Sequence, residues 1–249
     1  MFACSVLLGG PAAGAFSSDQ VWFPFDSGPL AVGETQVSAK NRGTADVTTS
    51  VVTTNGGRAV RAAGRDGGFA VRFPEESTNG PRAVLRVTND GEDQLNPNTS
   101  RFRFGAEVRL DAISVGTDDN GDNVLQRGLF GDQAQYKLQV DNRRPECRVK
   151  GAGGAVPVVS DVEMNARDWY RLVCTRDSST LTLRVVRFRP DGSRHSSTKT
   201  ASGRTGAVVA PSADTPMSVG GKLGADRMPA ASTDQFNGVI DEAFLRIRD

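Results

Sequence analysis

The stretch Arg101-Phe-Arg-Phe-Gly-Ala-Glu-Val-Arg-Leu110 alternates apolar and polar residues with a period of two. Every even-numbered position from 102 to 110 is apolar, whereas the odd-numbered positions carry three arginines, a glycine and a glutamate. Because successive side chains of a β-strand point to opposite faces, this pattern predicts a strand with one buried face and one face toward solvent.

The same alternation recurs on both sides of this stretch. Further strands are expected at 83–88, 136–140, 170–175, 181–188 and 239–247. Turn-forming residues cluster at 89–92, 118–123, 190–193 and 220–224, and the polar segment 193–204 is interpreted as a long loop. No window of helical length has a convincing 3.6-residue period. The chain is therefore predicted to be all-β, with two antiparallel sheets packed as a sandwich.

Length and charge limit the possible classes of protein. The 249 residues are enough for one large domain, and no low-complexity linker divides them. Thirty Lys and Arg against 29 Asp and Glu give a net charge of +1, so no overall field attracts nucleic acid or an acidic membrane. Charges, Gly or Pro interrupt every apolar stretch before it could span a bilayer.

The N-terminal segment has features of a secretory signal peptide. Residues 1–15 carry no charge, contain the apolar run Val6-Leu7-Leu8 and end in Ala13-Gly14-Ala15, a small-x-small pattern. The segment lacks a basic region, because the first lysine is Lys40, and its apolar run is short. The two interpretations are a signal whose start lies further upstream and an ordinary frayed terminus. We expect an exported protein with a single domain at 16–249.

Two cysteines lie in strand-like segments and share parity with apolar neighbours. Cys147 has the parity of Val149, and Cys174 that of Leu172, so both side chains are expected to point inward. In an exported protein they are expected to form a disulfide across neighbouring strands; the alternative is two buried free thiols. Together with the lone His195, they do not form a zinc-binding pattern.

Catalytic patterns are not found. A glucanase on such a sandwich needs paired carboxylates, and Glu-x-Asp-x-x-Glu does not occur. Glu107 and Asp111 share parity with Arg109 between them, which is interpreted as a solvated strand face. Nucleophilic hydrolysis would have to recruit His195 from a polar loop, and no phosphate-binding glycine loop is present. The sequence predicts no enzyme, with a glycoside hydrolase as the residual alternative.

Asp241 occupies an unusual position in the last expected strand. It shares parity with Val239, Ala243, Leu245 and Ile247, so its carboxylate is expected on the apolar side. Burial of a carboxylate is costly unless it is paired, hydrogen-bonded or coordinated. A structural Ca²⁺ held with loop carbonyls is one answer; hydrogen bonds from backbone amides or an arginine are the other. The segment 118–123 resembles half of a calcium loop but lacks the required Gly and Glu, which favours a turn.

The cysteine pair and Asn123-Val-Leu-Gln-Arg-Gly128 resemble the secreted actinobacterial branch of the laminin G-like, concanavalin A-like jelly-roll superfamily, and four stretches resemble the superfamily as a whole. They are Trp22-Phe-Pro-Phe-Asp-Ser-Gly28, Phe104-Gly-Ala-Glu-Val-Arg-Leu110, Trp169-Tyr-Arg-Leu-Val-Cys174 and Phe236-Asn-Gly-Val-Ile-Asp-Glu-Ala-Phe-Leu-Arg-Ile247. The last stretch is the most specific. The resemblance implies a non-catalytic recognition module of glycans or extracellular proteins, sometimes with a calcium ion. By this resemblance Asp241, and more distantly Asp26, would ligate the ion.

Few aromatic residues are available for stacking on sugars. The chain has two Trp and two Tyr, and Trp22 and Trp169 are expected in the core, as in the motifs they occupy. The sequence therefore predicts a secreted module that binds carbohydrate or another extracellular ligand. The alternative is a structural or adhesion domain with a protein partner. No nucleic-acid partner is expected, and Ca²⁺ is the one cofactor considered.

Overall fold

The computed structural model describes residues 19–75, 77, 79–114, 121–230 and 232–248, and the regular elements in these ranges are all strands. No helix in this part of the chain is long and apolar enough to cross a membrane. The expected signal segment 1–15 and the expected domain start at residue 16 lie outside the described residues, as do residues 118–120 of the turn expected at 118–123. Residues 121–123 of that expected turn belong to a strand.

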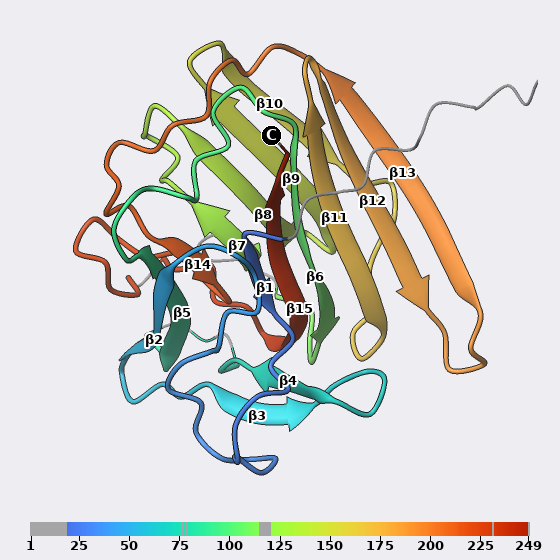
Figure 1. Cartoon of the computed structure of the whole chain (residues 1–249). Coiled ribbons are helices and arrows are strands. Elements are labelled where there is room, and N and C mark those ends of the chain that lie inside the picture. Colours follow the sequence, from blue (N-terminus) through green and yellow to red (C-terminus); the bar gives the residue numbers. More distant parts are fainter. Residues whose placement is uncertain (1–18, 76, 78, 115–120, 231, 249) are drawn as a thin grey trace, which may run out of the picture.

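The strands form two antiparallel sheets that pack face to face (Figure 1). The eight-stranded sheet has the order β13-β12-β11-β6-β15-β4-β3, and β1 pairs with β15 off this path. Its strands are β1 (Val21–Phe23), β3 (Val60–Ala63), β4 (Phe69–Arg72), β6 (Phe102–Leu110), β11 (Trp169–Asp177), β12 (Thr180–Phe188), β13 (Arg194–Ser202) and β15 (Gly238–Ile247).

The seven-stranded sheet has the order β10-β9-β8-β7-β14-β5-β2. Its strands are β2 (Val47–Thr54), β5 (Arg82–Asn89), β7 (Gly121–Arg127), β8 (Gln135–Asp141), β9 (Arg144–Gly151), β10 (Gly154–Val159) and β14 (Met217–Val219). This arrangement confirms the predicted all-β, two-sheet jelly-roll sandwich.

The core lies between the sheets and is built from one parity of each strand. In β6, Phe102, Phe104 and Val108 are buried, and in β8 the inward positions are Tyr136 and Leu138. Phe104 and Tyr136 come from opposite sheets, and their ring centroids lie 5.2 Å apart. The alternation in the sequence thus marks the face of each strand that the other sheet covers.

A disulfide joins Cys147 and Cys174, as expected, but its position differs from the prediction. Cys147 is on β9 of the seven-stranded sheet and Cys174 on β11 of the eight-stranded sheet, with Cα atoms 6.1 Å apart. The bridge therefore links the two layers through the core, and not two neighbouring strands of one sheet. Both cysteines face inward, as their parity predicted. Parity does not say whether the second cysteine lies on a neighbouring strand of the same sheet or on the opposite sheet.

Two further expectations were wrong. The polar segment 193–204 is largely the strand β13, paired with β12 along its whole length. It shows no apolar alternation because it is an edge strand with both faces mostly exposed. Trp22 is 37% exposed and Trp169 is only partly buried. Both tryptophans point away from the main core because Val21, Phe23 and Tyr170 take the inward positions beside them.

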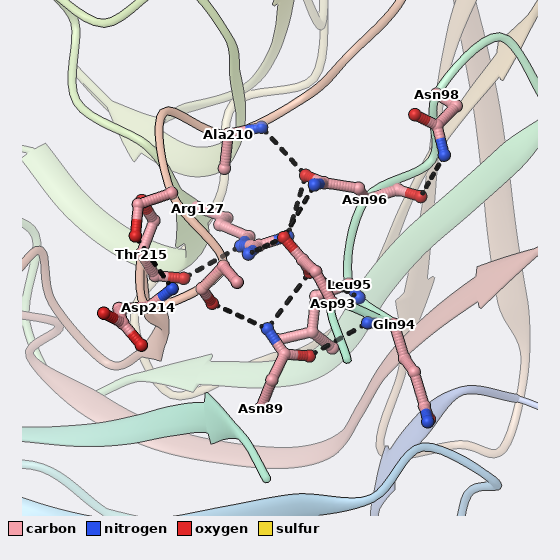
Figure 2. A network of polar contacts seen from close by, with 12 residues as sticks. Asn89, Asp93, Gln94, Leu95, Asn96, Asn98, Arg127, Ala210, Asp214 and Thr215 are labelled. Carbon is pink, nitrogen blue, oxygen red and sulfur yellow. Dashed lines mark hydrogen bonds and ion pairs between the residues drawn. The ribbon is translucent and has the colours of Figure 1, made fainter. Parts of the chain in front are cut away.

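A buried polar network closes one end of the sandwich (Figure 2). The Arg127 guanidinium, 2% exposed, donates to Asn96 Oδ1 at 2.9 Å, to Asp93 Oδ2 at 2.8 Å and to the carbonyl of Thr215 at 3.0 Å. Asn89 donates to Asp93 Oδ1 at 3.0 Å. One arginine of β7 thus holds two loops that are distant in sequence, 89–98 and 207–216, against the sheet end.

Candidate functional sites

The first candidate site lies where β15 bulges. Asp241 pairs with Glu107 of β6, and the register shifts between Asp241 and Phe244. Ile240 belongs to the main core, whereas Val239 packs in a separate small cluster outside it. Asp241, two positions after Val239, therefore points to the outer face of the eight-stranded sheet. The expectation that it faces the apolar interior with Ala243 was wrong, because the bulge changes the parity between the two residues.

Asp241 is nevertheless buried, because neighbouring segments cover it. Its exposed fraction is 8%, and its Oδ1 accepts a hydrogen bond from the amide of Glu242 at 2.7 Å. Burial, together with the negative charges of Glu242, Asp26 and Glu107, raises the pKa of Asp241 to about 8. The site therefore concentrates negative charge without enough compensating positive charge.

Asp26 approaches from the segment after β1 and meets the turn between β3 and β4. Its Oδ1 accepts a hydrogen bond from the amide of Phe69 at 2.7 Å. Two glycines of this turn leave space for the carboxylates. A Cβ on Gly64 would lie 2.9 Å from Asp241 Oδ2, and one on Gly68 would lie 2.6 Å from Asp26 Oδ1. The fold therefore brings the two sequence-predicted ligands to one glycine turn.

Two other carboxylates surround this pair. Glu107 is buried, and its Oε2 accepts from Arg65 Nε at 2.7 Å, while Arg171 lies 3.8 Å away. It is thus an ion-paired group, and the interpretation as a solvated face was wrong for this residue. Glu242 Oε2 accepts from Trp22 Nε1 at 2.6 Å. Burial is the main cause that raises the pKa of Glu242.

The arrangement fits a hard cation with few side-chain ligands. Among the described residues, no group of three or more His, Cys, Asp and Glu is arranged to hold a metal ion. Asp26 and Asp241 would therefore supply the carboxylates, and backbone carbonyls or water the remaining oxygens, which Ca²⁺ accepts. Burial raises the pKa of Asp241, and the turn at Gly64 and Gly68 carries no side chain that would occupy the space beside the two carboxylates.

The second candidate site, here called the amide hollow, lies on the outer face of the seven-stranded sheet. It is a depression of about 370 Å³ between β7, β8 and β9 and the loop after β7. Its lining includes three glutamines, three cations and one aromatic ring: Gln126, Gln135, Gln139, Lys137, Arg148, Lys222 and Phe130.

The polar groups of the amide hollow are held in place by neighbours. Gln139 Nε2 donates to Glu146 Oε2 at 3.1 Å, and Arg148 Nη1 donates to Gln135 Oε1. Gln126 Oε1 is buried and accepts no hydrogen bond from the described residues. Phe130 is 76% exposed, with the Arg148 guanidinium 4.5 Å from its ring centroid. The hollow offers fixed donors and acceptors beside one exposed ring.

Sequence reasoning did not single out the amide hollow. Part of the signal was present, since the alternation at 136–140 places Lys137 and Gln139 on the outward face of a strand. Gln126 and Arg148 lie beside Lys137 because β8 pairs with β7 and with β9. This pairing depends on long-range register, which has no local signature in the sequence. Phe130 lies in the loop that connects β7 to β8. The residues next to it in the sequence give no indication that its side chain is exposed.

Comparison with known proteins supports this architecture. The family model for the Laminin G domain matches residues 124–246. Among solved structures, the LG1–3 region of the laminin α2 chain matches with a TM-score of 0.50 and 16% identity, covering 65% of this chain and 30% of that one. No curated protein sequence matches.

Two toxin structures match over more of the chain. The binding domain of Paraclostridial Mosquitocidal Protein 1 has a TM-score of 0.57 and 13% identity. The binding domain of botulinum neurotoxin DC, solved in complex with rat synaptotagmin II, has a TM-score of 0.55 and 8% identity. Each match covers 93% of this chain and 49% of the other. This chain thus spans less than half of the length of any of the three structures.

At these identities the structures show a shared fold and no more. The matched segment 124–246 runs from β7 to β15 and contains strands of both sheets. The earlier strands β1 to β6 complete the same two sheets. Residues 124–246 are therefore similar to the Laminin G domain, and together with β1 to β6 they form a jelly-roll sandwich of the laminin G type.

Proposed function

We propose that this protein is a non-catalytic recognition module that binds carbohydrate in the amide hollow. The observation that carries the proposal is that Gln126, whose Oε1 is buried and unsatisfied, lines the same depression as the exposed ring of Phe130. A buried acceptor without a partner is costly, and a sugar hydroxyl would satisfy it while the ring packs against the sugar's C–H groups. The fixed amides Gln135 and Gln139 add further partners for hydroxyls.

The absence of catalysis is part of the proposal. Of the residues that line the amide hollow, Glu146 is the one carboxylate, whereas a glycosidase needs two across the scissile bond. The pair Glu107 and Asp241 lies on the other sheet, with Glu107 neutralised by Arg65. Export to an oxidising compartment agrees with the disulfide. The alternative is a structural or adhesion domain that binds an extracellular protein.

A glycan array tests the carbohydrate proposal. We expect the wild-type protein to bind a subset of glycans, and Phe130→Ala and Gln139→Ala to weaken the binding at least tenfold. Val32→Ala is a matched control, because Val32 is also exposed, at 60%, but lies away from the hollow. A blank array, or equal loss in the control, would contradict the proposal and favour a protein partner. Release of reducing ends from bound glycans would contradict the non-catalytic part.

We also propose that Asp26 and Asp241 hold a structural Ca²⁺. Thermal unfolding tests this: Ca²⁺ is expected to raise the Tm of the wild-type protein at neutral pH, and EDTA to reverse the effect, because a ligand that binds the native state stabilises it. Asp241→Asn should remove the response. Asp161→Asn, which changes an exposed carboxylate paired with Lys199, should keep it. An equal response in both variants would show that the ion binds elsewhere.

A further inference from the structure

The outer face of the eight-stranded sheet carries a second depression, here called the arginine groove. It has a volume of about 480 Å³ and lies over β6, β11, β12, β13 and β15. Among the described residues, its lining contains Thr and Ser hydroxyls and no carboxylate. It also contains four arginines: Arg103, Arg171, Arg184 and Arg194. In a chain with a net charge of +1, this is a strong local excess of positive charge.

The four arginines are distributed one to a strand. Arg103 is on β6, Arg171 on β11, Arg184 on β12 and Arg194 on β13, and these four strands are consecutive neighbours in the sheet. Neighbouring strands lie about 4.8 Å apart, and the arginines are also offset from one another along the strands. Arg103 lies opposite Thr175 of β11, and Arg184 lies opposite Val173 of β11. Arg194 lies opposite Phe188 of β12. The set therefore forms a zigzag band across the four strands.

The arginines at the outer end of the band are not neutralised by carboxylates. Arg184 Nε donates to Ser196 Oγ at 3.2 Å, and the Arg194 guanidinium lies 5.4 Å from the centroid of Phe188. In the described part of the chain, neither forms an ion pair with a carboxylate. At the inner end, burial and the nearby charge of Arg246 lower the pKa of Arg103. Arg171 lies 3.8 Å from Glu107, and Asp19 lies near Arg103. The groove therefore favours an anion most strongly at Arg184 and Arg194.

The other lining groups narrow the choice of anion. Val173 and Val186 provide apolar contacts between the arginines. The ring of Phe188 is already covered, because the guanidinium of Arg65 lies 3.9 Å from its centroid and that of Arg194 lies 5.4 Å from it. Phe244, the other ring in the lining, is only 6% exposed and has Arg103 5.9 Å from its centroid. The groove therefore offers no exposed, uncovered ring for the base stacking that single-stranded nucleic acids use. Apolar patches between cations suit the C–H faces of sugar rings.

From this arrangement we propose that the arginine groove binds a linear polyuronate, an acidic polysaccharide with one carboxylate on each sugar. The polymer crosses the strands, and its carboxylates meet the guanidinium groups that project from them. Guanidinium groups bind carboxylates through two parallel hydrogen bonds, which gives geometry as well as charge. The site is separate from the amide hollow, which lies on the other sheet.

Calorimetric titration with polygalacturonate tests this proposal. The wild-type protein is expected to bind polygalacturonate but not to bind neutral dextran at this site. Its affinity for polygalacturonate is expected to fall as NaCl screens the charges. The double variant Arg184→Gln/Arg194→Gln should weaken binding at least tenfold. Arg58→Gln/Arg204→Gln is the matched control, because it removes the same charge from exposed positions outside the groove and should retain wild-type affinity.

Three outcomes would overturn the proposal. They are no binding of polygalacturonate by the wild-type protein, an equal loss in both double variants, and equal or tighter binding of heparin or duplex DNA, which would indicate a general polyanion surface. Phe130→Ala should leave polygalacturonate binding unchanged, so failure of the amide hollow as a carbohydrate site and failure of the arginine groove can be told apart.

Discussion

At the scale of single residues, Glu242 has the largest effect on the first candidate site. It adopts a positive φ of 50°, which is uncommon for a residue other than glycine, and it lies within the bulge of β15. This conformation directs Asp241 to the outer face and returns Ala243 to the core. Such backbone strain is found where the surroundings enforce it, often at functional sites. Because Glu242 is not a glycine, the sequence contained no local sign of the bulge.

The raised pKa of Asp241 predicts how stability depends on pH in the absence of a bound cation. The ordinary pKa of Asp is about 3.9, and the folded value is about 8. Between these values the folded state binds the proton more tightly than the unfolded state, so stability falls as pH rises from about 4 to 8. We expect urea unfolding in EDTA to show Asp241→Asn gaining about 2 kcal/mol or more on wild type between pH 5 and pH 8. Parallel pH profiles would contradict this.

At the scale of elements, strands with one covered face were predictable and edge strands were not. The ranges expected at 83–88, 181–188 and 239–247 lie inside β5, β12 and β15. β13 was missed because water contacts most of both its faces, so its sequence carries no alternation. The same alternation that defined β6 also placed Arg103 on its outward face, so part of the arginine groove was implicit in the sequence. The neighbours β11, β12 and β13, which complete the groove, follow from pairing alone.

The disulfide links two elements of different sheets, and its removal has a defined expected cost. Cys147 and Cys174 are 27 residues apart, and the chain-entropy model gives about 3.5 kcal/mol for closing a loop of that length. We expect Cys147→Ala/Cys174→Ala to lose about this much free energy of unfolding in urea, and a reductant to lower the stability of the wild type but not of the variant. Peptide mapping under non-reducing conditions should recover the crosslinked pair. Two alkylated thiols in that experiment would refute the bridge.

At the scale of the whole molecule, both candidate sites and the arginine groove depend on contacts between distant segments. Asp26 meets Asp241 because β1 pairs with β15, and Glu107 joins them because β15 also pairs with β6. The resemblance to laminin G-like domains implied Asp241, and more distantly Asp26, as calcium ligands, and this stays a prediction. The amide hollow and the groove lay beyond such inference, since each combines residues from at least three strands whose register only the folded sheets define.

The last strand of the chain is also an interior strand of its sheet. β15 lies between β6 and β4 and also pairs with β1 (Figure 1). During synthesis, β6 and β4 leave the ribosome long before the segment that joins them, and each must wait with an unpaired edge. The hairpin of β3 and β4 and the four-stranded unit of β6, β11, β12 and β13 therefore stay unjoined until residues 238–247 have been translated. The two parts of this layer are united only when β15 emerges between them.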